Sequence, residues 1–341
     1  MSVLLVDWLG RGGIAQCAEA WAVELDRLGT DVHVVTRPDR ELGAGALRVD
    51  AAARAGGRIA AHRAVVRAAV DAIDVHRPSC VVIQNYVLPP LERAVHRAAR
   101  RVGARVVVVV HDDRLHTWRA GTGFGLVPLL RAADALVAHT HFVADAVAAA
   151  TGRSDVCVVD HPVQVGMLIW PRSGLHTPPA ALVAGHFGVL RRGYKGTSIV
   201  ERLARDGVDG WRFLLAGAGA RAVPGAVTMS GYLDPGALVA AVESTDATLL
   251  PYRRATQSGA VVLAQALESV PVASAVGGLP EQIDHGVDGV LVAPGTPPDG
   301  WARVLAELAD DDHRKALAAA GRARVWRQHD RFVRAIADLV S

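Results

Sequence analysis

The residues best suited to chemistry lie between Gly188 and Gly196, a segment that reads Gly-Val-Leu-Arg-Arg-Gly-Tyr-Lys-Gly. An arginine fork such as that of Arg191 or Arg192 binds two oxygens of one phosphate, and a lysine binds as a compact positive charge. Lys195 is one of only two lysines in the chain, which favours a functional role for it. The segment therefore predicts a diphosphate site, and a solvated basic turn is the alternative.

Two further segments place small residues at the predicted start of a helix. Gly10–Gly13 follows the first predicted strand, and Thr256–Ala260 follows a later one. The first N–H groups of a helix have no partner within the helix, so they can bind an anion. A tight turn is the alternative for the first segment. An N-cap role is the alternative for Ser258, although capping and phosphate binding use the same helix end.

His111 stands at the end of a predicted strand, with Asp112 and Asp113 after it. A histidine there suits a general base, a hydrogen-bond donor to a substrate, or a structural role. The two aspartates suggest a metal ion, but His139 lies at the end of a different strand and no second set of ligands converges. We therefore predict no metal site.

These residues need a scaffold, and short β-branched segments alternating with helical ones supply it. Such alternation predicts parallel sheets with right-handed crossovers. Helical periodicity runs from Ile14 to Leu28, and Gly29 ends that helix. The expected strands are Val3–Asp7, Val32–Thr36, Cys80–Gln84, Arg105–Val110, Ala135–His139, Val156–Val159, Ala181–Phe187, Arg212–Ala216, Ala226–Met229, Ala247–Leu250, Val272–Ser274 and Val290–Val292.

A chain of 341 residues is long enough for two domains. The prolines and glycines between Asp160 and Pro179 interrupt the strand–helix rhythm. We expect an α/β protein with two Rossmann-like, doubly wound domains that face a central cleft. Their expected limits are 1–162 and 180–322 with a linker at 163–179, and a C-terminal helix at about 323–341 is a candidate to pack on the first domain.

Composition narrows the classes of function. The absence of a long apolar run and of a basic leader predicts a cytoplasmic protein, and three widely spaced cysteines suggest reduced thiols. The segment 51–105 holds ten arginines and three acidic residues. This basic region raises the hypothesis of peripheral contact with anionic lipid, with a solvated face as the alternative. No aromatic residues interleave with it, which argues against nucleic acid binding.

Taken together, these segments resemble the retaining glycosyltransferases of the GT-B fold, the group 1 or family 4-like enzymes. The likeness covers nearly the whole chain and is strongest between Gly188 and Gly295. The matching segments are Phe187–Gly196, Leu214–Gly219, Pro251–Glu281 and Gly289–Val292 in the second half, and Gly12, Gly13 and His111 in the first.

The resemblance implies hexosyl transfer from a nucleoside-diphosphate sugar to an acceptor, with retention and without a metal or other cofactor. The acceptor, whether glycan, lipid-linked or small molecule, is expected on the first domain. Lys195 and either Arg191 or Arg192 would stabilise the leaving diphosphate. The implied catalytic residues are His111, Arg191 and Lys195, and the implied donor-binding residues are Gly12, Gly13, Arg192, Gly217, Tyr232, Leu233, Gln257, Ser258 and Gly259.

One departure from the family keeps other functions open. The family commonly has two glutamates eight residues apart, and those positions hold Thr256 and Ala264 here. A contact to the donor ribose must then come from elsewhere, with Gln257 as a candidate. A nucleotide-sugar 2-epimerase and a non-catalytic nucleotide-sugar-binding relative are therefore the alternatives. A nicotinamide dehydrogenase is disfavoured, because Gly10–Gly13 lacks the spacing of a dinucleotide fingerprint.

Overall fold

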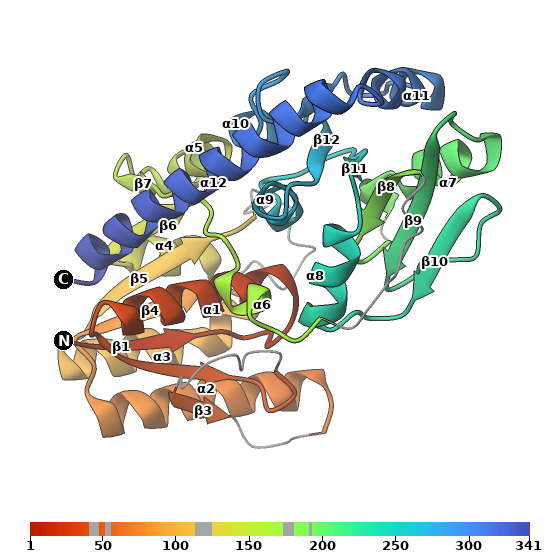
Figure 1. Ribbon diagram of the computed structural model, residues 1–341. Helices are drawn as coiled ribbons and strands as arrows, with labels where there is room; N and C mark the ends of the chain where they lie inside the picture. The colour runs from red at the N-terminus through yellow and green to blue at the C-terminus, as the bar shows by residue number, and fades with distance from the viewer. Residues whose placement is uncertain (41–47, 52–55, 113–124, 173–180, 191–192) are drawn as a thin grey trace. The chain divides into compact units, whose positions relative to one another are not determined.

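In a computed structural model of the chain, the described residues are 1–40, 48–51, 56–112, 125–172, 181–190 and 193–341. They divide into two compact units, coloured along the chain in Figure 1. Unit 1 comprises Met1–Gly166 and His329–Ser341, and unit 2 comprises Met167–Gln328. No helix among the described residues combines the length and the apolar content needed to cross a membrane.

Unit 1 is built on a parallel sheet of seven strands in the order β3-β2-β1-β4-β5-β6-β7. Its strands are β1 (Ser2–Val6), β2 (Asp31–Thr36), β3 (Arg48–Ala51), β4 (Cys80–Gln84), β5 (Arg105–Val110), β6 (Ala135–Ala138) and β7 (Val156–Val158). Its helices are α1 (Gly12–Arg27), α2 (Arg58–His76), α3 (Pro89–Val102), α4 (Leu126–Ala132), α5 (His141–Thr151) and the last turns of α12 (Asp311–Val340).

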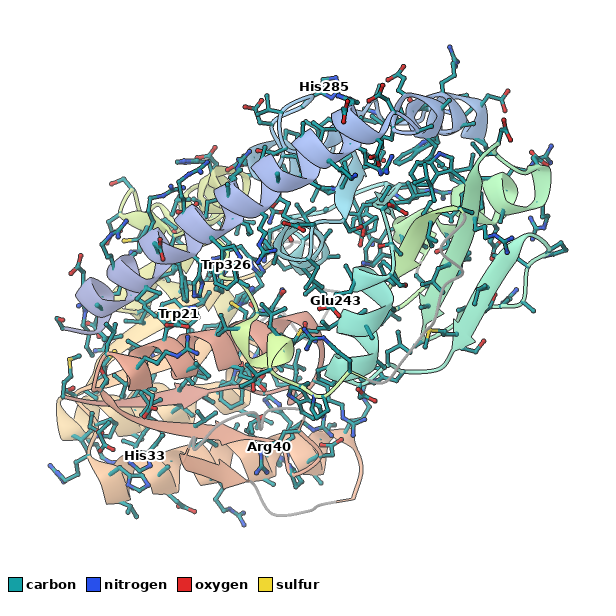
Figure 2. All side chains as sticks on the ribbon, viewed as in Figure 1. Trp21, His33, Arg40, Glu243, His285 and Trp326 are labelled. Atoms are coloured by element: carbon teal, nitrogen blue, oxygen red, sulfur yellow. The ribbon has the colours of Figure 1, made fainter. Side chains whose placement is uncertain are left out.

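The central strands of unit 1 are mostly apolar because both faces of the sheet are covered. In β5, Val106, Val108 and Val110 pack with α2, α3, α4 and α5, whereas Val107 and Val109 pack with α1 and α12. On the second face lies Trp21 of α1, which is labelled in Figure 2. Its ring meets that of Phe332 of α12 edge-on, with ring centroids 5.6 Å apart. The end of the chain therefore belongs to the core of unit 1.

Unit 2 holds a parallel sheet of six strands in the order β10-β9-β8-β11-β12-β13. Its strands are β8 (Leu182–Phe187), β9 (Trp211–Gly217), β10 (Ala226–Ser230), β11 (Ala247–Leu250), β12 (Val270–Ser274) and β13 (Val290–Val292). Its helices are α7 (Thr197–Asp206), α8 (Pro235–Glu243), α9 (Gly259–Ala266), α10 (Leu279–Gln282), α11 (Pro298–Glu307) and most of α12. The short helix α6 (Val165–Leu168) lies at the boundary between the units.

The predicted fold class, two Rossmann-like halves with parallel sheets, is confirmed. The sequence pattern did not predict one strand, β3. This strand has only four residues, two of them charged, and it pairs with β2 alone at the edge of the sheet. A short edge strand needs no long apolar run, so its sequence resembles a loop.

Candidate functional site

Unit 2 places its glycine-rich loops at one edge of the sheet, where the strand order reverses. β9 and β10 extend from one side of β8, and β11, β12 and β13 extend from the other. Since β8 and β11 are parallel, the loops that follow them leave the same edge on the two sides of this reversal. Ligands of open α/β sheets bind at such a position. The reversal between β8 and β11 is therefore the candidate site of unit 2.

Two glycines bring the backbone of neighbouring loops into contact at this edge. Gly188 follows β8 with φ of 107°, and Gly217 ends β9 with φ of 138°. Both angles lie where residues with a Cβ are strained. A Cβ on Gly217 would also overlap the carbonyl group of Gly188. Only glycine at position 217 allows the two loops to meet as they do.

We expect Gly217→Ala to lower the free energy of unfolding by at least about 2 kcal/mol, because it adds an overlap to an unfavourable φ. Urea unfolding followed by circular dichroism measures this change. Gly193→Ala is the matched control, since Gly193 has no positive φ and a Cβ there meets no atom within 4 Å. Equal stability of the two variants would contradict the structural role given to Gly217.

Lys195 lies at the reversal itself, at the end of the 3₁₀ turn η1 (Gly193–Lys195). Its Nζ donates a hydrogen bond to the hydroxyl of Tyr252 at 2.5 Å and lies 4.1 Å from the centroid of that ring. Tyr252 follows β11 and is only 3% exposed, so the contact joins the two sides of the reversal. The half-buried ammonium is thereby held where an anion can reach it. Arg191 and Arg192, predicted beside it, lie outside the described residues.

The start of α9 is fixed by Gln282 of α10. The side-chain Oε1 of Gln282 accepts a hydrogen bond from the backbone N–H of Ser258 at 2.7 Å, and its Nε2 donates to the carbonyl of Ser258 at 3.4 Å. Ser258 occupies the N-cap position, but its hydroxyl makes no capping hydrogen bond. Gln257, Ser258 and Gly259 therefore stand together at a helix N-terminus, where the helix dipole favours an anion.

The two residues predicted near the nucleobase differ in their surroundings. Both follow Gly231, which has φ of 106° after β10. Tyr232 is 49% exposed, whereas Leu233 is partly buried against the apolar cluster that contains Leu214 and Val239. A planar ligand that reaches this loop would therefore meet Tyr232 first, with Leu233 behind it in the core.

In unit 1, the glycine loop after β1 is held by the buried carboxylate of Asp7. This side chain accepts hydrogen bonds from the backbone N–H of Leu9 at 3.1 Å, from that of Gly10 at 2.8 Å and from the hydroxyl of Thr36 at 2.9 Å. Burial raises the pKa of Asp7, and these hydrogen bonds oppose the rise. Gly12 opens α1, and a Cβ on Gly12 or Gly13 would meet no atom within 4 Å. The first residues of α1 therefore have no side chain that would keep a ligand away from the backbone.

His111 follows β5 and belongs to a buried cluster. Its Nε2 lies 2.9 Å from the Oε1 of Gln84, and its ring centroid lies 5.3 Å from that of His139. Burial holds the pKa of His111 well below its usual value, and the nearby His139 and His161 add to this effect. His111 is therefore neutral at pH 7. A neutral imidazole can accept a proton or donate a hydrogen bond, as the sequence reading expected of a site residue.

The prediction of no metal site rested partly on His111 and His139 ending different strands. These strands are neighbours, however, and their register pairs Val110 with Ala138. The next residue of each strand is one of the two histidines, and Cys17 of α1 joins them. A sequence reading could have found the pair by assuming that consecutive parallel strands lie side by side.

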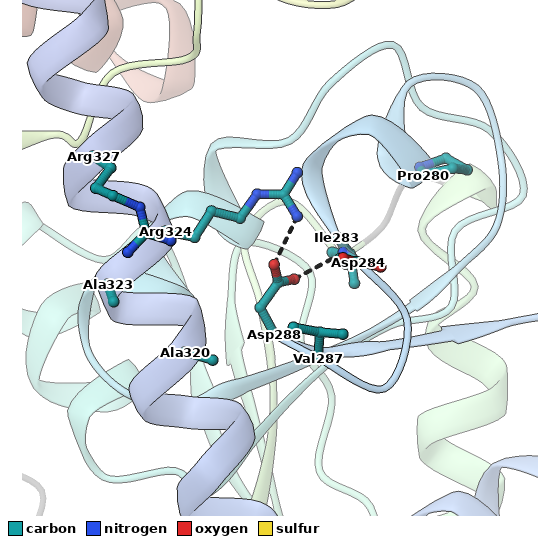
Figure 3. A pocket seen from close by; sticks show the side chains of 9 residues that line it. All are labelled: Pro280, Ile283, Asp284, Val287, Asp288, Ala320, Ala323, Arg324 and Arg327. Atoms are coloured by element: carbon teal, nitrogen blue, oxygen red, sulfur yellow. Dashed lines mark hydrogen bonds and ion pairs between the residues drawn. The ribbon is translucent and has the colours of Figure 1, made fainter.

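A separate hollow of about 630 Å³ lies in unit 2 against α12 (Figure 3). Arg324 bridges it by an ion pair with Asp288 at 2.7 Å and a hydrogen bond to the carbonyl of Glu281 at 2.8 Å. None of the predicted site residues is among those that line it, so this hollow and the loops at the β8–β11 reversal are distinct features. The lining residues are Pro280, Ile283, Asp284, Val287, Asp288, Ala320, Ala323, Arg324 and Arg327.

Comparison with known sequences matches residues 187–311 to the family described as glycosyl transferases group 1. The matched region contains both sides of the β8–β11 reversal. Residues 187–311 of this chain are therefore similar to the group 1 glycosyltransferases.

A stretch of 81 residues of this chain is 40% identical to the D-inositol 3-phosphate glycosyltransferase of Thermobispora bispora. That stretch is 24% of this chain and spans about a fifth of the relative, 19% of its length. The segments that carried the resemblance between Gly188 and Gly295 lie in the region matched to the family, and the prediction of the family is confirmed.

Two solved structures share the fold over nearly the whole chain. Anabaena Alr3699/HepE, in complex with UDP-glucose, is 18% identical with a TM-score of 0.72, covering 100% of this chain and 98% of that one. A putative UDP-N-acetylglucosamine 2-epimerase from Listeria monocytogenes is 12% identical with a TM-score of 0.64, covering 96% and 94%. At such identities the likeness concerns the fold alone, which both classes share.

Thr256 and Ala264 occupy the positions at which the family commonly has two glutamates, and the structure shows the surroundings of the second. Ala264 is fully buried within α9. The polar groups around it belong to Gln265, which donates to the carbonyl of Gln282 at 3.2 Å. The position that would carry the second glutamate is thus part of the apolar core of unit 2, and no carboxylate is available from it.

Proposed function

We propose that this chain transfers a hexosyl group from a nucleoside-diphosphate sugar to an acceptor hydroxyl, with retention of configuration and without a metal ion. In this reaction the bond between the sugar C1 and the diphosphate oxygen breaks, and the diphosphate leaves with the electron pair. The acceptor oxygen forms the new bond to C1 and loses its proton. The main need of such a reaction is stabilisation of the negative charge that develops on the diphosphate.

The observation that carries this proposal is the placement of Lys195 by Tyr252 at the β8–β11 reversal. Ser258 and Gly259, at the N-terminus of α9, follow β11 on the other side of the same reversal. An ammonium group and a helix N-terminus together form a positive environment for a diphosphate. In this proposal Gly217 provides a close backbone approach, Tyr232 meets the base with Leu233 behind it, and Gln257 contributes a polar contact.

His111, Gly12 and Gly13 take the roles in unit 1 that the family resemblance implies. His111, neutral at pH 7, is proposed to hydrogen-bond the transferred sugar, and the bare backbone at Gly12 and Gly13 to approach the donor. Arg191 or Arg192 is proposed to share the diphosphate with Lys195.

The acceptor is proposed to bind unit 1. The exposed arginines of this unit favour a lipid-linked acceptor. Arg63 and Arg67 of α2 and Arg93 and Arg97 of α3 are exposed. Arg101 is already paired with Asp74 at 2.9 Å, which reduces the charge available to lipid headgroups. Peripheral membrane contact and a cytoplasmic location stay predictions.

Nucleoside diphosphates test the donor site directly. UDP, GDP and ADP are added separately to the full chain without added metal, and the unfolding temperature is followed by calorimetry. A ligand at 100 times its dissociation constant stabilises the native state by about 2.7 kcal/mol. We expect one of the three to raise the unfolding temperature. Stabilisation by none of them would contradict the proposed donor site.

Product analysis then separates the three functions that share this fold. With the matching nucleotide sugar, a transferase or its slow hydrolytic side reaction releases free nucleoside diphosphate. A 2-epimerase returns an isomerised nucleotide sugar, and a non-catalytic relative binds the nucleotide and returns the sugar unchanged. We expect free nucleoside diphosphate, and recovery of an isomer would overturn the transferase proposal in favour of the epimerase.

A further inference from the structure

Three buried side chains of unit 1 converge on one point. Cys17 lies on α1, His111 follows β5 and His139 follows β6. Each offers one donor atom, and the three atoms all lie within 4.8 Å of one another. All three residues are at most 7% exposed. The strand register fixes the two histidines beside each other, so the cluster is a consequence of the fold.

The hydrogen bonds around the cluster orient its donor atoms. The Nδ1 of His139 lies 2.9 Å from the carbonyl oxygen of Val159, which can only accept, so Nδ1 carries the proton. The Nε2 of His139 is then unprotonated, and it lies 3.4 Å from the Sγ of Cys17. A backbone carbonyl that fixes the tautomer of a histidine in this way is the usual outer-shell arrangement around a metal ligand. Gln84 positions His111 in a similar manner.

The donor types select the metal. One thiolate and two imidazoles suit Zn²⁺, whereas Mg²⁺ and Ca²⁺ prefer oxygen ligands. Tetrahedral Zn²⁺ with bonds of about 2.0–2.3 Å holds neighbouring donor atoms at roughly 3.5 Å. The Cys17–His139 pair already has this separation at 3.4 Å. The three donor atoms lie within 4.8 Å of one another, so the third donor needs to move by at most about 1.3 Å to reach this separation. Three protein ligands leave a fourth position of the ion open.

Zinc binding forms the Zn–S bond and releases the proton of the Cys17 thiol to solvent, so the charge entering the buried site is lower than that of the bare ion.

We propose that Cys17, His111 and His139 bind one Zn²⁺ ion at the carboxyl end of β5 and β6. The site is separate from the donor-binding loops of unit 2. It shares His111 with the sugar contact proposed above, so a bound ion and that contact exclude each other.

The test uses the full chain stripped of metal with a chelator. Zn²⁺ is titrated in competition with a chromogenic chelator, and Co²⁺ replaces it in a second titration because a cobalt–thiolate bond has a charge-transfer absorption. We expect one equivalent of tightly bound Zn²⁺ and the thiolate band with Co²⁺. Cys17→Ser should weaken Zn²⁺ binding at least about tenfold and abolish the band.

Matched controls come from the other two cysteines, Cys80, which is buried, and Cys157, which is exposed. Cys80→Ser and Cys157→Ser should bind Zn²⁺ as the unchanged protein does. His139→Asn is the second ligand variant, used with circular dichroism to show that its fold is intact. The proposed site would be overturned if the unchanged protein bound no stoichiometric Zn²⁺. It would also be overturned if folded Cys17→Ser and His139→Asn bound Zn²⁺ as tightly as the unchanged protein does.

Discussion

Lys195→Ala is expected to lower the rate of nucleoside diphosphate release about 100- to 1,000-fold, the usual cost of removing one preorganised group that stabilises transition-state charge. In the proposed function the Lys195 ammonium faces the diphosphate at the β8–β11 reversal, and the other lysine of the chain is Lys315. The measurement is single-turnover release of nucleoside diphosphate from the donor identified by thermal shift, at saturating donor. A rate unchanged from that of the unaltered protein would remove Lys195 from the catalytic site.

Lys315→Ala is the matched control for this variant. Lys315 is exposed on α12 and pairs with Asp311 at 2.5 Å, away from the reversal. Its removal takes away the same charge from the same unit, so a loss of rate confined to Lys195→Ala reports on position and not on net charge. Tyr252→Phe keeps the ring under the ammonium and deletes the hydrogen bond at its hydroxyl. We expect it to cause a smaller loss of rate than Lys195→Ala.

Mild acid is expected to destabilise the protein strongly, because several buried histidines stay neutral in the folded state. Their pKa values are lowered from 6.5 by burial, to about 4 for His96 and His186 and to about 3 for His161. Between pH 6.5 and about 4 the unfolded chain therefore binds protons that the folded chain does not. The free energy of unfolding falls as the pH is lowered through this range, by up to about 1.4 kcal/mol per pH unit for each such histidine.

The two units should respond unequally to acid. Unit 1 holds His96, His111, His139 and His161, whereas unit 2 holds only His186 among the described residues with lowered values. Calorimetry at pH 7 and pH 5 should show the larger loss of stability in unit 1. His313→Asn is the control, since His313 is exposed on α12. Equal stability at the two pH values would show that these histidines are protonated in the folded protein.

The strands that the sequence predicted with correct limits are mostly apolar and mostly buried. Cys80–Gln84, Arg105–Val110, Ala247–Leu250 and Val290–Val292 were all predicted as they occur. The strand that starts at Val270 was predicted two residues short, with Pro271 left outside it. A proline has no backbone N–H to donate to a neighbouring strand. A sequence pattern therefore disfavours proline inside a strand, even at a position where no such hydrogen bond is needed.

The parts of the candidate site that could not be predicted depend on contacts across the sheet. Lys195 was found from its glycine-rich surroundings and the scarcity of lysine, which are local signals. Its partner Tyr252 lies 57 residues further along the chain and becomes its neighbour only because β8 pairs with β11. Gln282, which fixes Ser258 across 24 residues, is a similar case. Single-sequence patterns contain the periodicity of each element but not the order of strands that creates such pairs.

The core of unit 1 has a consequence for how the protein is made. Phe332 and Ile336 are fully buried in the same apolar cluster as Trp21 and Leu25. The ribosome synthesises these last residues after all of unit 2, whose chain from Met167 to Gln328 is continuous. Unit 1 begins first but can complete its core only when residues 329–341 have left the ribosome. Unit 2 is therefore the part of the chain that can reach its final packing first during translation.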